Sequence, residues 1–98
     1  MRDWVLDRQA EADLDAQLDY LIQRGAVNAA ERLSARVKSF LCEFLTAHPA
    51  TGVFLDHRGL WETWVPGTRL VLWYRFTETE VQVARIWHTA RDREDTSL

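Results

Sequence analysis

Apolar residues recur about every 3.6 residues through most of the first half of the chain, a spacing typical of amphipathic helices. The first periodic stretch follows Asp7 and ends at Gly25. The second runs from Asn28 to the His48–Pro49 pair, where proline rules out continuation. The pattern therefore predicts two helices joined by residues 25–27, an αα-hairpin. The predicted core stripes are Ala10, Leu14, Leu18, Leu21 and Ile22, and then Ala30, Leu33, Val37, Phe40, Leu41, Phe44 and Leu45.

Residues near the helix ends have side chains or conformations suited to capping. Asp7 is the expected N-cap of the first helix, because its carboxylate can accept from free backbone N–H groups. Asn28 and Glu31 have the spacing of a capping box for the second helix. Gly25 is the expected stop of the first helix, since glycine tolerates the left-handed conformation.

The second half of the chain reads as strands. Residues 50–59 contain many helix and strand breakers and are expected to form a loop. Three runs follow at residues 60–65, 69–76 and 81–88, with connections short enough to favour an antiparallel meander. Residues 2–6 are expected to add a short edge strand. The order is then βααβββ, an α+β fold with the helical hairpin packed on a small antiparallel sheet.

Alternation within the strands predicts which side chains share a face. In the second long run, the expected set is Leu70, Leu72, Tyr74 and Phe76. In the last run, the two expected sets are Val81, Val83, Arg85 and Trp87, and Gln82, Ala84, Ile86 and His88.

The composition fits one soluble globular domain covering residues 1–98, with 47% apolar and 28% charged residues. The formal net charge is −3, which does not favour a protein that coats nucleic acid. We therefore expect no sequence-specific DNA binding by this chain alone.

Targeting and redox signals are sparse. The N-terminus has no apolar stretch typical of a signal peptide, and no run is long enough to cross a membrane. Cys42 is the only cysteine, so an intrachain disulfide is excluded. Because Cys42 lies in an apolar run, we expect it to be a small buried side chain. These features predict a cytoplasmic protein.

No familiar catalytic or cofactor motif is present. The three histidines lack metal-ligand spacing, so we expect no metal and no cofactor. Asp15 and Asp19 form an i,i+4 pair on the first helix, which is most simply a solvated face. His88, at the end of the last strand, is either a general base or a hydrogen-bonded structural side chain.

Tryptophans are frequent in the three predicted strands. Trp61, Trp64, Trp73 and Trp87 cannot all point the same way, so some should lie on the sheet face away from the helices. An uncovered aromatic face would mark a partner site, whereas a covered one would be ordinary core.

The chain as a whole resembles the RelE/ParE toxin superfamily of bacterial type II toxin–antitoxin modules, in its ParE-like branch. Residues 12–22 resemble the first helix of that family, and residues 29–33 resemble the start of its second. Residues 48–52 resemble its "x-P-x-x-G" exit. The most informative stretches are VPGT at 65–68, YRF at 74–76 and ARIWHTARD at 84–92, which are similar to the ParE-like ending.

The resemblance implies a βααβββ toxin that a cognate ParD-like antitoxin neutralises. RelE-like members are ribosome-dependent mRNA endonucleases that use strand lysines and arginines. At the corresponding positions this chain has Glu62, Trp64 and Val71. A carboxylate in place of a cation works against phosphodiester cleavage, because such an enzyme must offset the charge of the scissile phosphate.

The first interpretation is therefore a ParE-like toxin that poisons DNA gyrase and has no catalytic residues of its own. One alternative is a diverged mRNA interferase that uses Arg69, His88 and Arg91, and another is a non-toxic binding module. For antitoxin binding we expect Trp73 and Trp87, beside the outer helix faces. Arg93 is the expected contact to the cellular target, whereas Arg91 is expected to pair with Asp13 or Asp15.

Overall fold

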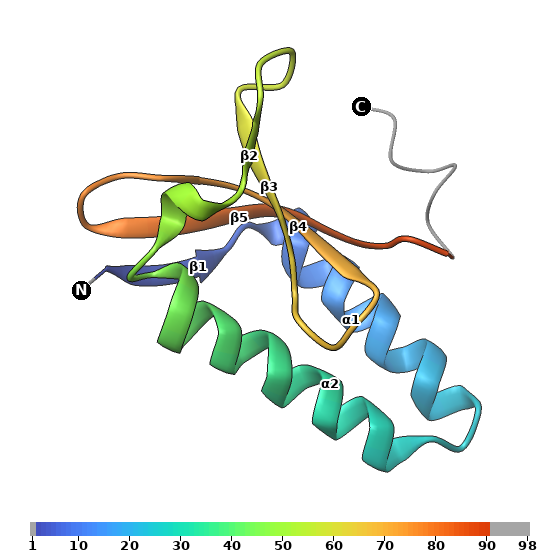
Figure 1. The fold of residues 1–98 in the computed structure, drawn as a ribbon. Helices are drawn as coiled ribbons and strands as arrows, with labels where there is room; N and C mark the ends of the chain where they lie inside the picture. Colours follow the sequence, from blue (N-terminus) through green and yellow to red (C-terminus); the bar gives the residue numbers. More distant parts are fainter. Residues whose placement is uncertain (1, 91–98) are drawn as a thin grey trace.

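The computed structural model describes residues 2–90. Within this part of the chain, the helical hairpin consists of α1 (Arg8–Gln23) and α2 (Val27–Phe40). A short π-helical segment, η1 (Leu41–Leu45), extends α2, and a 3₁₀ turn, η2 (Pro49–Thr51), follows. Both predicted helices are therefore confirmed, and they lie side by side along one face of the molecule (Figure 1).

Across residues 3–88, five strands form one sheet in the order β1-β5-β4-β3-β2. The strands are β1 (Asp3–Leu6), β2 (Val53–Leu55), β3 (Leu60–Trp64), β4 (Leu70–Phe76) and β5 (Glu80–His88). The predicted edge strand at the N-terminus is confirmed. The predicted loop at 50–59 is partly wrong, because it contains β2 as well as η2.

The expectation of an entirely antiparallel sheet is also wrong. Strands β2 to β5 are antiparallel to their neighbours, but β1 pairs with β5 in parallel. The whole helical hairpin and three strands lie between β1 and β5 in sequence, and this is ample chain for a parallel return. The β2–β3 hairpin projects from the sheet on the side away from the helices (Figure 1).

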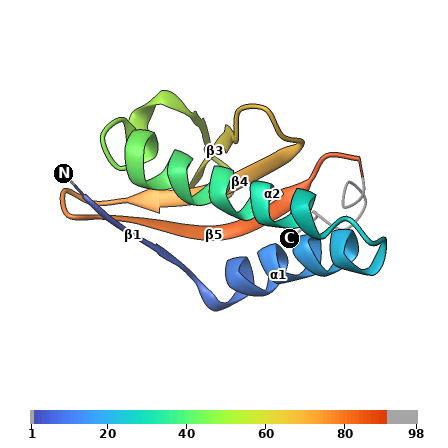
Figure 2. The same ribbon diagram turned by 90° about the horizontal axis from the view of Figure 1, so that it is seen from below.

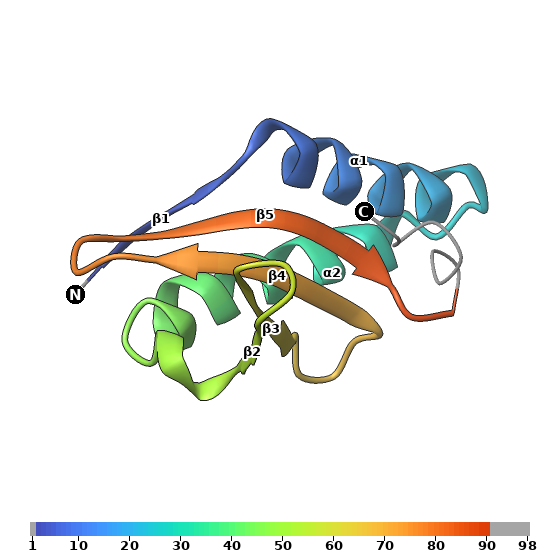
Figure 3. The same cartoon turned by 90° about the horizontal axis from the view of Figure 1, so that it is seen from above.

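The main core lies between the helical hairpin and one face of the sheet (Figure 2). As predicted, Leu70, Leu72 and Tyr74 are buried there and Phe76 packs against them. Helix α1 runs alongside β5, just beyond the point where β1 ends (Figure 3). In the stripe of α1, Ala10 and Leu14 are buried, whereas Ile22 is exposed at the far end of the helix.

The helix ends differ from the expected capping. Gly25 has φ +78° and ends α1 as predicted, with its N–H donating to Ile22 and that of Ala26 to Leu21. Asp7 occupies the N-cap position, but its carboxylate binds Arg75 at 3.1 Å instead of the helix N–H groups. The predicted Asn28–Glu31 capping box is wrong. Helix α2 begins one residue earlier, after Ala26, and no side chain in residues 2–90 caps it.

The end of the second helix turns two predicted core residues outward. In η1 the backbone bond from Thr46 reaches back five residues to Leu41, at 3.2 Å. Leu41 and Leu45 are buried, so Cys42, one position after Leu41, faces solvent. The expectation of a buried Cys42 is therefore wrong. Phe44 was expected in the core and is also exposed.

A bulge in β5 changes the predicted faces of the last strand. Tyr74 pairs with Val83 and Trp73 pairs with Arg85, so Ala84 is an extra residue without a partner on β4. Val81 and Val83 are buried in the main core as a pair. After the bulge the alternation shifts by one residue. Ile86 enters the main core in place of Arg85, and Trp87 lies on the opposite face of the sheet.

Candidate functional site

The face of the sheet away from the helices carries a smaller aromatic cluster, here called the outer face. Its buried members are Leu60, Val71 and Trp73, and Trp87 packs against them. The indole N–H of Trp73 donates to Glu62 Oε2 at 2.8 Å. The Trp73 and Trp87 rings meet edge to face at 6.0 Å, and the Arg58 guanidinium lies 4.6 Å from the Trp73 ring centre. Trp73 is therefore only 4% exposed and stabilises the outer face from within.

The accessible part of the outer face is formed by Trp64 and Trp87. Val71 pairs with Trp64 on one side and with Trp87 on the other, so the three side chains form one row across the sheet. Trp64 is 55% exposed and Trp87 is half-buried. The indole N–H of Trp87 is covered, yet it has no hydrogen-bond partner among residues 2–90.

Of the four tryptophans in β3 to β5, Trp61 faces the helices, so the prediction that these rings divide between two faces is confirmed. Trp61 packs against the main core. Its ring lies 5.4 Å from Phe54 and 5.5 Å from Phe76. The Arg2 guanidinium stacks over Phe76 at 5.6 Å and closes this row.

Three strand positions at which a RelE-like nuclease would carry cations lie on the outer face. Glu62 accepts the Trp73 hydrogen bond, Val71 is 1% exposed, and Trp64 projects into solvent. None of these three side chains neutralises a phosphate, and the Arg58 guanidinium on the same face is stacked over the Trp73 ring. The outer face is therefore suited to packing against apolar groups of a partner.

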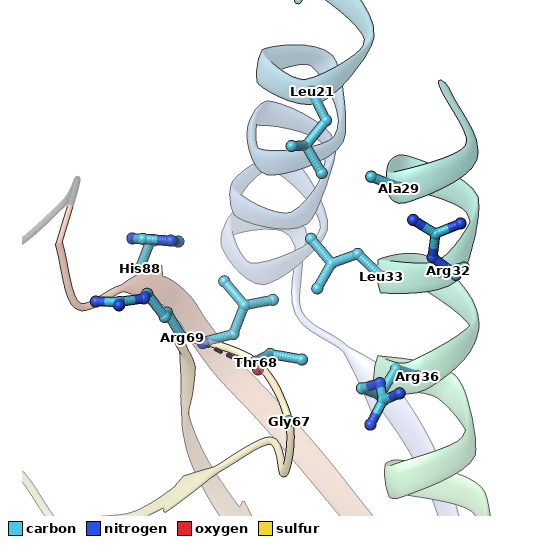
Figure 4. Close-up of a pocket in the computed structure, with 10 residues that line it drawn as sticks. Leu21, Ala29, Arg32, Leu33, Arg36, Gly67, Thr68, Arg69 and His88 are labelled. Atoms are coloured by element: carbon cyan, nitrogen blue, oxygen red, sulfur yellow. Dashed lines mark hydrogen bonds between the residues drawn. The ribbon is translucent and has the colours of Figure 1, made fainter. Parts of the chain in front are cut away.

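A second feature, here called the arginine pocket, lies between the helices and the β3–β4 turn. It is a hollow of about 290 Å³ with an apolar floor and a basic rim (Figure 4). The floor is formed by Leu21, Ala29, Leu33 and Leu70, and the rim by Arg32, Arg36, Arg69 and His88, with Gly67 and Thr68 at the turn. No carboxylate lines it among residues 2–90.

Pairing between β4 and β5 builds one side of this pocket. Leu70 pairs with His88, and the Thr89 N–H donates to the Arg69 carbonyl at 3.0 Å, so Arg69 and His88 lie side by side (Figure 4). The His88 ring accepts the Ala90 N–H through Nδ1 at 3.1 Å. This supports the view of His88 as a hydrogen-bonded strand-end residue.

The opposite side of the pocket is formed by α2 and the turn. Gly67 has φ +76°, and a side chain at this position would collide with the Arg36 guanidinium. Arg36 donates to the Pro66 carbonyl at 3.4 Å. Within residues 2–90, neither Arg32 nor Arg69 forms an ion pair, because the salt bridges there involve other arginines. In the part of the chain that the structure describes, the Arg32 and Arg69 guanidinium groups therefore stand above an apolar floor without a carboxylate partner.

The arginine pocket was only partly visible in the sequence. Arg32 and Arg36 are an i,i+4 pair on α2, which was a usable signal for a basic helix face. Arg69 and His88 were considered as nuclease residues, and the structure does bring them together. Arg91 and Arg93 lie outside the described residues.

Asp13 of α1 pairs with Arg85, and the expected pairing with Arg91 lies outside the described residues. Its carboxylate accepts Arg85 Nε at 2.7 Å and the Ile86 backbone N–H at 3.0 Å. The bond from the Ile86 N–H gives an acceptor to a backbone donor on the edge of β5, beyond the point where β1 stops pairing with it. Asp15 and Asp19 are exposed. Among residues 2–90, no three His, Cys, Asp or Glu side chains are placed to hold a metal ion.

Tyr74 connects the main core to η2. Its hydroxyl donates to the Pro49 carbonyl at 2.5 Å. Burial raises the pKa of Tyr74 to about 12, although the backbone N–H of Gly52 partly opposes the shift. A phenol that stays protonated in this way acts as a structural donor.

In the chain from residue 2 to 90, neither helix has the length and apolar content that a bilayer crossing requires.

Comparisons with known proteins agree with this arrangement. A solved structure described as the chromosomal ParDE TA system from P. aeruginosa has a similar fold, with a TM-score of 0.65 and 23% sequence identity. The match covers 90% of this chain and 96% of that chain. No curated protein matches the sequence. The family model for the ParE toxin of the type II toxin–antitoxin system parDE matches residues 5–93. The chain therefore belongs to the ParE toxin family of type II toxin–antitoxin systems.

Proposed function

We propose that this toxin stops growth by poisoning DNA gyrase in the cytoplasm, that it does so without catalysing a reaction itself, and that a ParD-like antitoxin neutralises it. Membership of the ParE family supports the toxin and antitoxin parts of the proposal. The choice of gyrase depends mainly on one observation, the chemistry of the outer face.

The outer face lacks the groups that RNA cleavage requires. A metal-independent ribonuclease stabilises the charge that develops on the scissile phosphate and moves protons with side chains placed beside it. Here the relevant strand positions carry a carboxylate, an exposed indole and a buried valine. The Glu62 carboxylate would repel a phosphate, and the cation on its row, Arg85, is already paired with Asp13.

One observation favours the runner-up, an mRNA interferase. Arg69 and His88, two of the residues that such an enzyme would use, share the arginine pocket. The pocket that they line lies between the helices and the β3–β4 turn, whereas three strand positions of the RelE-like nuclease set, Glu62, Trp64 and Val71, are on the outer face. Cleavage by this chain would therefore need a relocated site. We consider gyrase poisoning the better-supported function.

The exposed tryptophans support the antitoxin part of the proposal. Trp87 and Trp64 present an apolar row, and a partner that covers it would remove both rings from water. A partner acceptor could also bind the Trp87 indole N–H, which is buried and has no acceptor within the described residues. Trp73 supports this surface indirectly, because its ring packs edge to face against the Trp87 ring. For Arg93 we retain the proposal of a target contact.

A growth experiment tests this proposal against both alternatives. The chain is induced alone in a bacterium with sensitive gyrase, and cell length, plasmid topology and mRNA integrity are followed together. We expect growth arrest, filamentous cells and broken or relaxed plasmid DNA, with mRNA left intact. Co-expression of the antitoxin encoded beside the toxin should restore growth.

Two outcomes would contradict the proposal. Codon-phased mRNA cleavage, lost on Arg69→Ala, would favour the interferase. Normal growth at verified expression would favour a non-toxic binding module. Arg8→Ala serves as a matched control for the arginine variants, because Arg8 is exposed at the start of α1 and away from the arginine pocket and the outer face.

A further inference from the structure

The arginine pocket continues into a second hollow along α2. This hollow measures about 330 Å³ and shares Arg36 with the pocket. Its other lining residues are Ser39, Phe40, Glu43, Phe44 and Pro66. The two hollows together are here called the α2 groove. Arg36 stands at their junction, beside the β3–β4 turn.

The second hollow is the apolar half of the groove. Phe40 and Phe44 stack with ring centres 5.5 Å apart and planes 18° from parallel. Phe44 is 41% exposed, although a ring of this size is normally covered. Its other ring neighbour is His48, at 5.2 Å. The π-helical segment η1, which turns Phe44 outward, therefore creates an apolar contact surface beside the basic pocket.

The arginine pocket is the basic half. Its rim carries three guanidinium groups, yet the whole chain has a formal net charge of −3. From residue 2 to residue 90, no carboxylate lines this half, and Glu43 lies in the apolar half. Positive charge is thus concentrated locally in an acidic protein. A carboxylate placed here would receive charge-assisted hydrogen bonds above a low-dielectric floor.

The apolar floor of the pocket favours an acidic polypeptide over a nucleic acid as the anionic partner. A nucleic acid would bring phosphates on every nucleotide and would be repelled by the acidic remainder of the chain. It would also leave the floor of Leu21, Leu33 and Leu70 without an apolar partner. A polypeptide that alternates acidic and apolar side chains satisfies both halves of the groove. Charge and apolar surface therefore favour a peptide segment.

The positions of the two halves also define how far apart the acidic and the apolar side chain of a bound segment should be. The basic pair, Arg32 and Arg36, is centred eight residues before the apolar pair, Phe40 and Phe44. Eight residues correspond to about 12 Å along a helix, which is therefore the distance between the two binding positions. An extended segment covers that distance in about four residues and a helical one in about eight.

We propose that the α2 groove binds a segment of the antitoxin that inserts an acidic side chain among Arg32, Arg36 and Arg69 and an apolar side chain against Phe40 and Phe44. This assignment rests on the proposed neutralisation by an antitoxin. The acidic and apolar side chains are about four residues apart if the segment is extended and about eight if it is helical. The groove is separate from the tryptophan row, so the antitoxin contacts two faces of the toxin.

Binding measurements with charge reversal test the proposal. The probe is the purified antitoxin encoded beside the toxin gene, titrated into wild-type toxin and into the variants Arg32→Glu and Arg69→Glu. Each variant should weaken binding at least ~10-fold, because a repelled carboxylate replaces a paired one. Arg8→Glu has the same change of charge on an exposed part of α1 and should change the affinity less than ~2-fold.

Rescue makes the test specific. Each acidic residue of the antitoxin is changed to arginine in turn, and one such change should restore binding to Arg69→Glu or Arg32→Glu while weakening binding to wild type. Phe44→Ala should weaken binding at least ~10-fold with a small effect on the melting temperature, since Phe44 is 41% exposed and lies outside the main core. Melting curves of the variants confirm that each one is folded.

The failures can be told apart. Wild-type affinity in both charge-reversal variants, with a neutralising antitoxin, overturns the groove assignment and leaves the proposed function intact. Lost toxicity with unchanged antitoxin affinity also overturns the assignment, because the groove then contacts the cellular target. An antitoxin that does not bind the wild-type toxin at all overturns the proposed function together with this inference.

Discussion

Removing the Asp13 carboxylate should destabilise the fold more than any other single charge change in α1. The side chain is 11% exposed and its partner Arg85 is 20% exposed. Asp13→Ala removes the 2.7 Å bond to Arg85 and the 3.0 Å bond to the Ile86 N–H. A guanidinium is then left largely buried without a counter-charge, and a strand N–H is left without an acceptor.

The size of the effect follows from this geometry. Breaking a fully buried ion pair costs ~3–5 kcal/mol, and the partial exposure of this pair reduces the expected loss to ~2–3 kcal/mol. For a domain of about this size, such a loss lowers Tm by at least ~8 °C. Asp13→Asn should cost less, since its side-chain carbonyl can still accept the Ile86 N–H.

Urea unfolding of Asp13→Ala, Arg85→Ala and the double variant measures the coupling directly. The double-mutant cycle should give a coupling free energy of at least ~1.5 kcal/mol. Asp15→Ala is the matched control, because that carboxylate is exposed on the same helix, and it should stay within ~0.5 kcal/mol of wild type. A loss below ~0.5 kcal/mol in Asp13→Ala, or no coupling to Arg85, would refute the reasoning.

Three further predictions follow from other parts of the structure. Because the pKa of Tyr74 rises from 10.0 to about 12 on folding, the unfolded chain loses this proton first as pH rises. The free energy of unfolding should therefore fall by ~1.4 kcal/mol per pH unit between pH 10 and 12. Tyr74→Phe should cost ~1–3 kcal/mol at pH 7 and should remove that pH dependence in denaturant titrations. A slope unchanged in the variant would contradict the assignment. Gly52→Ala would place its Cβ 2.5 Å from the Glu62 carbonyl oxygen and 2.6 Å from Tyr74 Oη, so it should cost ~1–3 kcal/mol by calorimetry; a wild-type Tm would count against this close approach. Trp87→Ala should weaken antitoxin binding at least ~30-fold, equivalent to ~2 kcal/mol, provided that circular dichroism shows a folded variant. An unchanged dissociation constant would remove Trp87 from the interface.

The helices were predictable because their cores follow one period over many residues, and β4 was predictable because it alternates without interruption. Strand β2 was not, since Val53–Leu55 is three residues long and lies among glycine and threonine. The bulge at Ala84 leaves no sign in the pattern of side chains, yet it exchanges the faces of Arg85 and Ile86. Local periodicity carries no information on an inserted residue that only strand pairing reveals.

The candidate sites were also only partly predictable from the sequence. Trp73 and Trp87, both expected to bind the antitoxin, lie on one surface, but Trp87 is there only because of the bulge. Their relative exposure depends on Glu62 and Arg58, which reach the Trp73 ring from another hairpin. The arginine pocket combines a helix, a turn and a strand end that are far apart in sequence. Asp13 was expected to bind an arginine near the C-terminus. Its actual partner, Arg85, is brought close by the packing of α1 against β5.

The central claim, gyrase poisoning without nuclease chemistry, is tested most directly with purified gyrase. Relaxed plasmid, gyrase and ATP are incubated with increasing toxin, and supercoiled and linear DNA are quantified after protein removal. The account predicts loss of supercoiling and accumulation of gyrase-linked linear DNA, both reversed by the antitoxin. Full supercoiling at toxin concentrations that halt translation in a matched cell-free reaction, with mRNA cut on the ribosome, would contradict it.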